Sequence, residues 1–160
     1  MERVHHYLTS VVWTGNKGEG TSHYRAYERD HTVSVKDKPE IPGSSDPAFR
    51  GNPSRYNPEE FLLAALSSCH MLSYLHLCAV NKVVVVDYRD RAEGTMEETS
   101  DGGGHFTVAI LRPVVTVAEE AMADKARQLH HEASRLCFIA NSVNFPVSHE
   151  PEIRVEARPA

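Results

Sequence analysis

Hydrophobic and polar residues alternate at the start of the chain and predict extended structure there. Val4 to Trp13 is expected to form a strand, the polar run GNKGEGTS a turn, and His23 to Lys36 a second strand, so the chain should open with a β-hairpin. Alternation with period two would place Arg25 and Arg29 on one face of the second strand. The next segment, residues 37–56, holds four prolines and two glycines and predicts a long loop.

A long apolar segment follows and has a clear helical start. Asn57 is suited to the N-cap, Pro58 to the first helical position, and Glu59 and Glu60 to the positive end of the helix dipole. Glu60 also completes an Asn variant of the capping box. Apolar residues then occupy nearly every side through Val80, which predicts a central helix buried all round. Because one small domain can hardly cover such a helix, we expect a homodimer.

The second half of the chain predicts two more strands, a second helix and a closing strand. A strand should begin at VVVVDY and extend to Glu98, SDGGGH should form the hairpin turn, and FTVAILRPVVTV should form the returning strand. Thr116 and Glu119 are expected to make a capping box. An amphipathic helix should follow, defined by apolar residues at steps of four and three, namely Met122, Ala126, Leu129, Ala133, Leu136 and Ala140, and it carries Cys137 near its end. A last strand is expected over residues 147–157.

The predicted order ββ-α-ββ-α-β indicates an α+β fold with a mostly antiparallel sheet, a buried central helix and a second amphipathic helix. A chain of 160 residues with this order fits a single domain, residues 1–160. No internal repeat or low-complexity tract is present.

Charge and composition narrow the classes of function. The net charge is −5 and the basic residues are scattered, which argues against a nucleic-acid binder and against a membrane-surface helix. The N-terminus lacks an apolar signal core, and Ser, His and Glu interrupt the long apolar segment, so we expect a cytoplasmic protein that does not span a membrane. In a reducing compartment its three cysteines are buried small residues or reactive thiols rather than structural disulfides.

Helix geometry limits which cysteines can act together. Cys69 and Cys78 lie nine residues apart on one predicted helix, which is about 13.5 Å along the axis and about half a turn out of phase. They cannot form a disulfide, so an intramolecular pair must contain Cys137, with Cys69 or Cys78 as its partner. Serines surround Cys69, whereas apolar residues flank Cys78, which is better explained as core.

Metal and phosphate sites are not supported. Cys69 and His70 are adjacent and diverge, Cys69 and His76 are about 10 Å apart along the helix, and His130 and His131 splay. We therefore predict neither a metal site nor a bound cofactor. The GGGH run lies between two strands rather than before a helix, which predicts a turn and not an anion-binding loop. A Cys-His hydrolase stays open from composition alone.

Two stretches resemble the OsmC/Ohr family, the osmotically inducible and organic hydroperoxide resistance proteins. NPEEFLLAALSSC resembles the family's central-helix motif and ends on Cys69, and ASRLCFIANSV supplies Cys137 where the family has its second cysteine. The order of strands and helices also agrees. The resemblance implies an OsmC-like fold, an intertwined dimer and a thiol-dependent peroxidase. In it Cys69 would be the peroxidatic residue and Cys137 the resolving residue, with an external dithiol as reductant.

The family also has a Glu and an Arg beside the reactive thiol. Glu59 matches the Glu by position, although on a straight helix it is about 15 Å from Cys69, so it would have to act across a dimer interface or through an arginine. Near the first hairpin turn, where the family has its Arg, this chain offers only Lys17. The resemblance therefore assigns the role to Arg25, with Arg29 as the alternative. Phe138 follows Cys137, where the family often has Pro.

The leading hypothesis is thus a cytoplasmic, homodimeric peroxidase for organic hydroperoxides that uses Cys69, Cys137, Glu59 and Arg25. The alternative is a non-catalytic module that binds a small hydrophobic ligand in the dimer cleft, with its cysteines serving as core residues. A third hypothesis, the Cys-His acyl hydrolase, requires a histidine within hydrogen-bonding reach of Cys69.

Overall fold

The computed structural model describes residues 1–159, which divide into two compact units at Phe61 and Leu62. The first unit contains β1 (Ser10–Trp13), β2 (His31–Ser34), β3 (Ile41–Gly43), the short 3-10 helix η1 (Pro47–Phe49) and the start of α1 (Pro58–Val80). The second contains the rest of α1, β4 (Val85–Asp90), β5 (Glu93–Glu98), β6 (Gly104–Leu111), β7 (Pro113–Val117), η2 (Glu120–Met122), α2 (Ala123–Leu136), η3 (Ala140–Ser142), β8 (Val147–His149) and β9 (Glu152–Val155).

The first unit is an antiparallel sheet in the order β1-β2-β3, with Trp13 opposite His31 and Val33 opposite Ile41. The predicted opening hairpin is confirmed, but its strands are shorter than expected. Residues 23–27 form turns and bends and residues 28–30 belong to no strand, so the prediction that Arg25 and Arg29 share a strand face is wrong. The Arg29 guanidinium donates hydrogen bonds to the carbonyl oxygens of Tyr24 and Tyr27, which holds this segment folded back on itself.

The predicted long loop contains some regular structure. β3 adds a third strand to the sheet, and the Asp46 carboxylate caps η1 by accepting a hydrogen bond from the Ala48 N–H at 2.7 Å. The Arg55 guanidinium pairs with the Asp30 carboxylate at 3.1 Å. These contacts fix the segment that leads into α1.

The central helix α1 begins where the sequence predicts. The Asn57 side chain accepts a hydrogen bond from the Glu60 N–H, and the Glu60 carboxylate accepts one from the Asn57 N–H, so the capping box is confirmed. Within one chain, however, only a single stripe of the helix is buried, formed by Leu66, His70, Tyr74 and Cys78. Leu72 is 62% exposed and Val80 61%, so complete burial, for which we expect a second subunit, stays a prediction.

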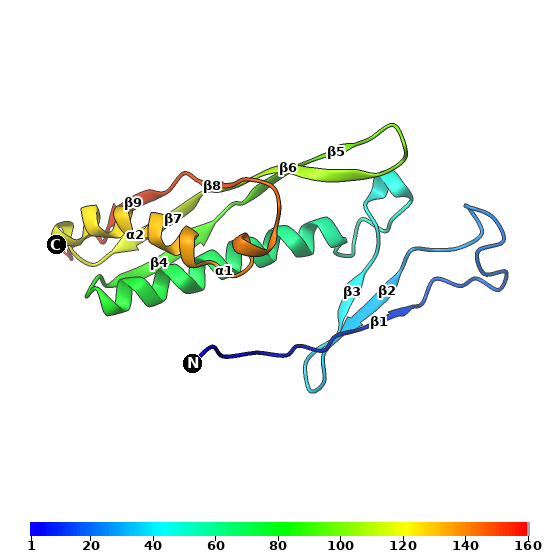
Figure 1. Ribbon diagram of the computed structural model, residues 1–160, viewed down its shortest axis with the longest axis horizontal. Coiled ribbons are helices and arrows are strands. Elements are labelled where there is room, and N and C mark those ends of the chain that lie inside the picture. The colour runs from blue at the N-terminus through cyan, green and yellow to red at the C-terminus, as the bar shows by residue number, and fades with distance from the viewer. Residues whose placement is uncertain (160) are drawn as a thin grey trace. The chain divides into compact units, whose positions relative to one another are not determined.

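Two three-stranded sheets form most of the second unit, β4-β7-β9 and β5-β6-β8 (Figure 1). The pairs β4-β7 and β5-β6 are antiparallel, whereas β7-β9 and β6-β8 are parallel. Each long strand predicted in this half is interrupted and forms two shorter strands. The Asp90 carboxylate, at the end of β4, accepts a hydrogen bond at 2.7 Å from the N–H of Arg112, which lies between β6 and β7. The predicted α+β class with mostly antiparallel pairing is confirmed.

By length and apolar composition, α1 is the one helix among residues 1–159 that would suffice to cross a bilayer. The central helix of a globular domain has the same length and composition, so this property assigns no membrane location.

The second helix differs from its prediction at both ends. Thr116 lies within β7, paired with Asp87 and Arg154, and α2 starts at Ala123 without a side-chain cap, so the predicted capping box of Thr116 and Glu119 is wrong. The helix ends at Leu136, because the backbone of Cys137 is extended with ψ near 113°.

One hydrophobic core joins α1, α2 and the sheet β4-β7-β9 in the second unit. Its buried members are Tyr74, Cys78, Val83, Val115, Val117, Ala126, Leu129 and Ala133. Cys78 is 1% exposed, which confirms its prediction as a core residue.

Candidate functional site

The structure brings the thiols of Cys69 and Cys137 together in the second unit. Cys69 lies on α1 and is half-buried, whereas Cys137 directly follows α2 and is 1% exposed. Burial raises the pKa of the Cys137 thiol, and the hydrogen-bonding neighbour Cys69 raises it further, while the Ala140 N–H lowers it in part. Cys137 is thus held as a neutral thiol beside the more open Cys69.

The chain that leaves α2 folds around Cys137. The Ala140 N–H points at its sulfur with N···S 3.4 Å, and the Asn141 N–H donates to its carbonyl oxygen at 3.0 Å. The Asn141 side chain donates to the Arg135 carbonyl, one of those left free at the helix end. This local turn positions the thiol, and the apolar periodicity that predicted a helix as far as Ala140 contains no sign of it.

A pocket of about 520 Å³ opens beside Cys69. It is lined mostly by apolar side chains with three polar ones, namely Ala65, Ser68, Cys69, Leu72, Ser73, His76, Phe138 and Ile139. Phe138, which follows the buried thiol, is 77% exposed. Of the two thiols only Cys69 lines the pocket, so a molecule entering it meets Cys69 first.

Behind Cys69, on the buried side of α1, lies a stack of aromatic rings that the sequence did not reveal. His70 Nε2 and His130 Nδ1 share a hydrogen bond of 3.0 Å, and His149 stacks against both rings. Burial lowers the pKa of His70 to about 4 and that of His130 to about 3, so both imidazoles are neutral near pH 7. The sequence analysis did not predict this pairing of His70 with His130.

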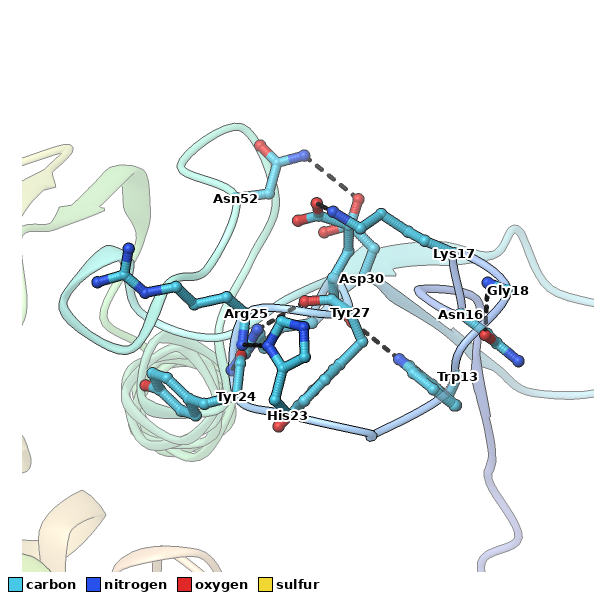
Figure 2. Close-up of polar contacts among 12 residues, drawn as sticks. Trp13, Asn16, Lys17, Gly18, His23, Tyr24, Arg25, Tyr27, Asp30 and Asn52 are labelled. Atoms are coloured by element: carbon cyan, nitrogen blue, oxygen red, sulfur yellow. Dashed lines mark hydrogen bonds and ion pairs between the residues drawn. The ribbon is translucent and has the colours of Figure 1, made fainter.

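The other predicted site residues lie in the first unit. Glu59 occupies the first turn of α1, is half-buried, and forms no ion pair or side-chain hydrogen bond with residues 1–61. Arg25 is exposed in a turn, and Figure 2 shows its guanidinium extended without a polar contact.

The two other cationic candidates in this unit already have partners. Arg29 donates to two backbone carbonyls and lies over the rings of Tyr24 and Tyr27, and Lys17 pairs with Glu28 at 3.2 Å. Among these cations Arg25 is therefore the one whose charge stays free within residues 1–61.

No group of three or more His, Cys, Asp or Glu residues within residues 1–159 has the arrangement of a metal site. The rings of His70, His130 and His149 stack with interplanar angles of 7° to 29°, so their nitrogens do not converge on one point.

Comparisons with known proteins agree with this fold. Residues 51–152 match the family model of OsmC-like proteins. The solved structure of an OsmC-like protein of unknown function from Vibrio cholerae O1 biovar eltor is 32% identical, with a TM-score of 0.82 over 92% of this chain and 99% of the other. No curated protein matches the sequence.

Two organic hydroperoxide resistance proteins share the fold at lower identity. The structure from Elizabethkingia anophelis is 14% identical, with a TM-score of 0.70 over 98% of this chain and 100% of the other. The one from Legionella pneumophila is 16% identical, with a TM-score of 0.69 over 96% and 99%. At such identity these likenesses concern the fold.

Proposed function

The chain belongs to the family of OsmC-like proteins, and on that premise we propose that it is a thiol-dependent peroxidase that reduces organic hydroperoxides. The observation that carries this proposal is the unequal pair of thiols. Cys69 opens into a mostly apolar pocket, and the buried Cys137 lies directly behind it. A nucleophile exposed to substrate with a second thiol in contact is the arrangement that disulfide-forming peroxidases require.

The reaction follows from this arrangement in three steps. The Cys69 thiolate attacks the terminal oxygen of the hydroperoxide, the O–O bond breaks, and the alcohol leaves after taking up a proton, while Cys69 becomes a sulfenic acid. The Cys137 thiol then displaces water from the Cys69 sulfur and forms the disulfide. An external dithiol reduces that disulfide by two successive exchanges and is itself oxidised.

The apolar lining of the pocket favours a hydroperoxide with an organic group over hydrogen peroxide. Ala65, Leu72, Phe138 and Ile139 would bury that group, whereas Ser68, Ser73 and His76 offer hydrogen bonds to its polar end. Neither a metal nor a bound cofactor has a part in these steps.

We assign Arg25 and Glu59 to the activation of Cys69. A guanidinium near the sulfur would favour the thiolate and polarise the peroxide, and Glu59 would orient the guanidinium. Within residues 1–61 both have no other partner, which leaves them free for this role. Arg25→Gln should lower kcat/KM at least about tenfold, whereas the exposed Arg3→Gln should leave it unchanged. Equal activity of the two variants would remove Arg25 from the mechanism.

The protein is further proposed to be a homodimer, because the sides of α1 that carry Leu72 and Val80 are exposed in one chain. Its cytoplasmic location stays the prediction made from the sequence. Light scattering coupled to size exclusion should give about twice the 17.9 kDa mass of the chain. A stable monomer would contradict the dimer and with it any role of Glu59 across subunits.

The decisive experiment is to add one equivalent of an alkyl hydroperoxide to the reduced protein and to map the thiols by mass spectrometry. We expect a Cys69–Cys137 disulfide, free Cys78, and steady peroxide consumption when a dithiol is supplied. Thiols that all stay free under excess peroxide would overturn the peroxidase. If a hydrophobic molecule also co-purified with such an inert protein, the ligand-binding alternative would be favoured.

A further inference from the structure

Three contacts join α1 to α2 and to the residue that follows α2, and their order runs in opposite directions along the two segments. Tyr74 donates its hydroxyl hydrogen to the Ala126 carbonyl at 2.9 Å, His70 shares a hydrogen bond with His130, and Cys69 contacts Cys137. Going back along α1 therefore means going forward along α2. The histidine pair is the contact next to the thiol pair.

Both histidines of the pair are buried. His70 is 2% exposed and His130 is 0% exposed, and the Tyr74 ring lies flat against His130 with 3.8 Å between centroids. His130 precedes Cys137 by seven residues, and Cys137 directly follows the last residue of α2, so the position of Cys137 depends on that of the helix. A shift of His130 relative to His70 would carry Cys137 with it.

The hydrogen bond between the imidazoles requires one donor and one acceptor. If both rings carried a proton on each nitrogen, two N–H groups would face each other and the bond would be lost. The other nitrogen of His130, Nε2, is buried without a partner among residues 1–159, so a proton there would have no acceptor. The geometry thus excludes two charged imidazoles.

Titratable side chains on the strands and helices around the two histidines influence whether the imidazoles are charged. Asp90 on β4 favours a positive charge on His70, whereas His149 on β8 opposes a charge on His70 and on His130, and His131 on α2 acts on His149 in turn. Tyr74, Tyr88 and Cys78, whose pKa values burial raises, stay uncharged. Burial is the largest influence on both imidazoles and keeps them neutral.

We propose that His70 and His130 are positioning residues for the thiol pair: their hydrogen bond holds α2 in register with α1 and so keeps Cys137 within reach of an oxidised Cys69. The inference rests on the proposed function, because it concerns the step in which Cys137 attacks the Cys69 sulfenic acid. The two buried histidines would thus position the thiols without taking part in the peroxide chemistry itself.

The test uses 2,2′-dithiodipyridine instead of a peroxide. It is carried out in the Cys78→Ala variant, which keeps only two thiols and is the parent of the other variants. Cys69 attacks this disulfide and releases one thiopyridone, and Cys137 then displaces the second thiopyridone and forms the Cys69–Cys137 disulfide. The two molecules appear as two absorbance phases, and the rate of the second phase measures how well Cys137 is positioned. The reagent reacts in mild acid as well as at neutral pH.

His130→Leu removes the hydrogen bond at similar volume, and His130→Asn places an amide near Nδ1 that still bonds His70 and takes up no proton. We expect the Leu variant to slow the second phase at least about tenfold with the first phase unchanged. The Asn variant should restore it to within about threefold. Between pH 5 and pH 3 the second phase of the parent should fall relative to that of the Asn variant, because only the parent can charge both imidazoles, whose pKa values are about 4 and about 3. The exposed His105→Asn serves as the control and should match the parent throughout.

An unchanged second phase in a folded His130→Leu variant would overturn the inference. If that variant did not fold, the pH comparison decides, and a constant ratio of parent to Asn variant would overturn it equally. Failure of the proposed function has a different signature, since hydroperoxide would then leave Cys69 reduced while the two thiopyridone phases behaved as stated.

Discussion

The two faces of α1 carry the same kinds of side chain in opposite surroundings. The buried face presents His70, Tyr74 and Cys78 to α2 and the sheet, and the open face presents Cys69 and His76 to the pocket. Each face thus has one cysteine and one histidine. Residue type alone does not separate the thiol that we propose as the nucleophile from the thiol in the core.

What separates them is the neighbours that the fold supplies. Burial raises the pKa of Cys78, which the Tyr74 hydroxyl lowers only in part, and the lining of the pocket of about 400 Å³ beside Cys78 does not include Cys137. Cys69 also lines a pocket, but it is only half-buried and it contacts a second thiol. The comparison teaches that a nucleophile needs both access and a partner, and that burial without a partner makes an inert core residue.

The sharpest way to break this comparison is to remove one cysteine from each face. Cys69→Ser should abolish hydroperoxide turnover, a loss of at least roughly 1,000-fold, because a hydroxyl cannot replace the thiolate. Cys78→Ala should keep turnover within about twofold and cost about 1 kcal/mol of folding free energy for the lost core volume. Peroxide assays and thermal unfolding measure the two effects. Turnover lost from Cys78→Ala instead would reverse the assignment of the faces.

Cys137→Ser tests whether Cys69 needs a second thiol, and it leaves Cys69 beside the pocket unchanged. Without the second thiol, the Cys69 sulfenic acid cannot close to a disulfide and should oxidise further to sulfinic acid. We expect turnover with a dithiol to fall roughly tenfold or more, and the mass of the peptide containing Cys69 to rise by two oxygens. If Cys69 kept full turnover and never reached the sulfinic state, Cys137 would not be its resolving thiol.

The buried histidines should make the free energy of unfolding depend on pH in the acid range. The pKa values of His70 and His130 fall from 6.5 in the unfolded chain to about 4 and about 3 in the folded protein, so the unfolded state binds more protons below pH 6.5. Stability is therefore complete above pH 6.5 and is lost as pH falls toward 4, by up to about 1.4 kcal/mol per pH unit for each imidazole. Chemical denaturation at several pH values measures it. A slope that His130→Asn left unaltered would exclude this histidine as its source.

Local chemistry made much of the fold predictable. The capping box of Asn57 and Glu60, the start and end of α1, and the hairpin turn between β5 and β6 depend on neighbouring residues and are confirmed, although Gly104 and His105 of the predicted turn lie in β6. The alternation in residues 23–30 misled, because the backbone contacts of Arg29 outweigh strand propensity there. The parallel pairing of β8 and β9 depends on distant partners and leaves no periodicity in the sequence.

The site was predictable to the extent that it follows from a motif or a helix. Helical spacing excluded a pair of Cys69 and Cys78, and the family resemblance singled out Cys69 and Cys137. The bond between His70 and His130 joins residues sixty positions apart, and only the tertiary fold creates it. The roles of Glu59 and Arg25 stay predictions, because their partners lie outside the contacts described within residues 1–61.

The smallest effect on disulfide formation should come from the contact between α1 and α2 that lies farthest from the thiols, the hydrogen bond of Tyr74 to Ala126. Tyr74→Phe removes the hydrogen bond to the Ala126 carbonyl and keeps the ring that stacks on His130, so it should cost about 1 kcal/mol of folding free energy. The exposed Tyr7→Phe is the matched control and should cost nothing measurable. Because the histidine bond lies between Tyr74 and the thiols, disulfide formation in Tyr74→Phe should stay within about twofold of the parent. A larger loss of disulfide formation would show that the register of α1 and α2 is set at Tyr74 and not at His70 and His130.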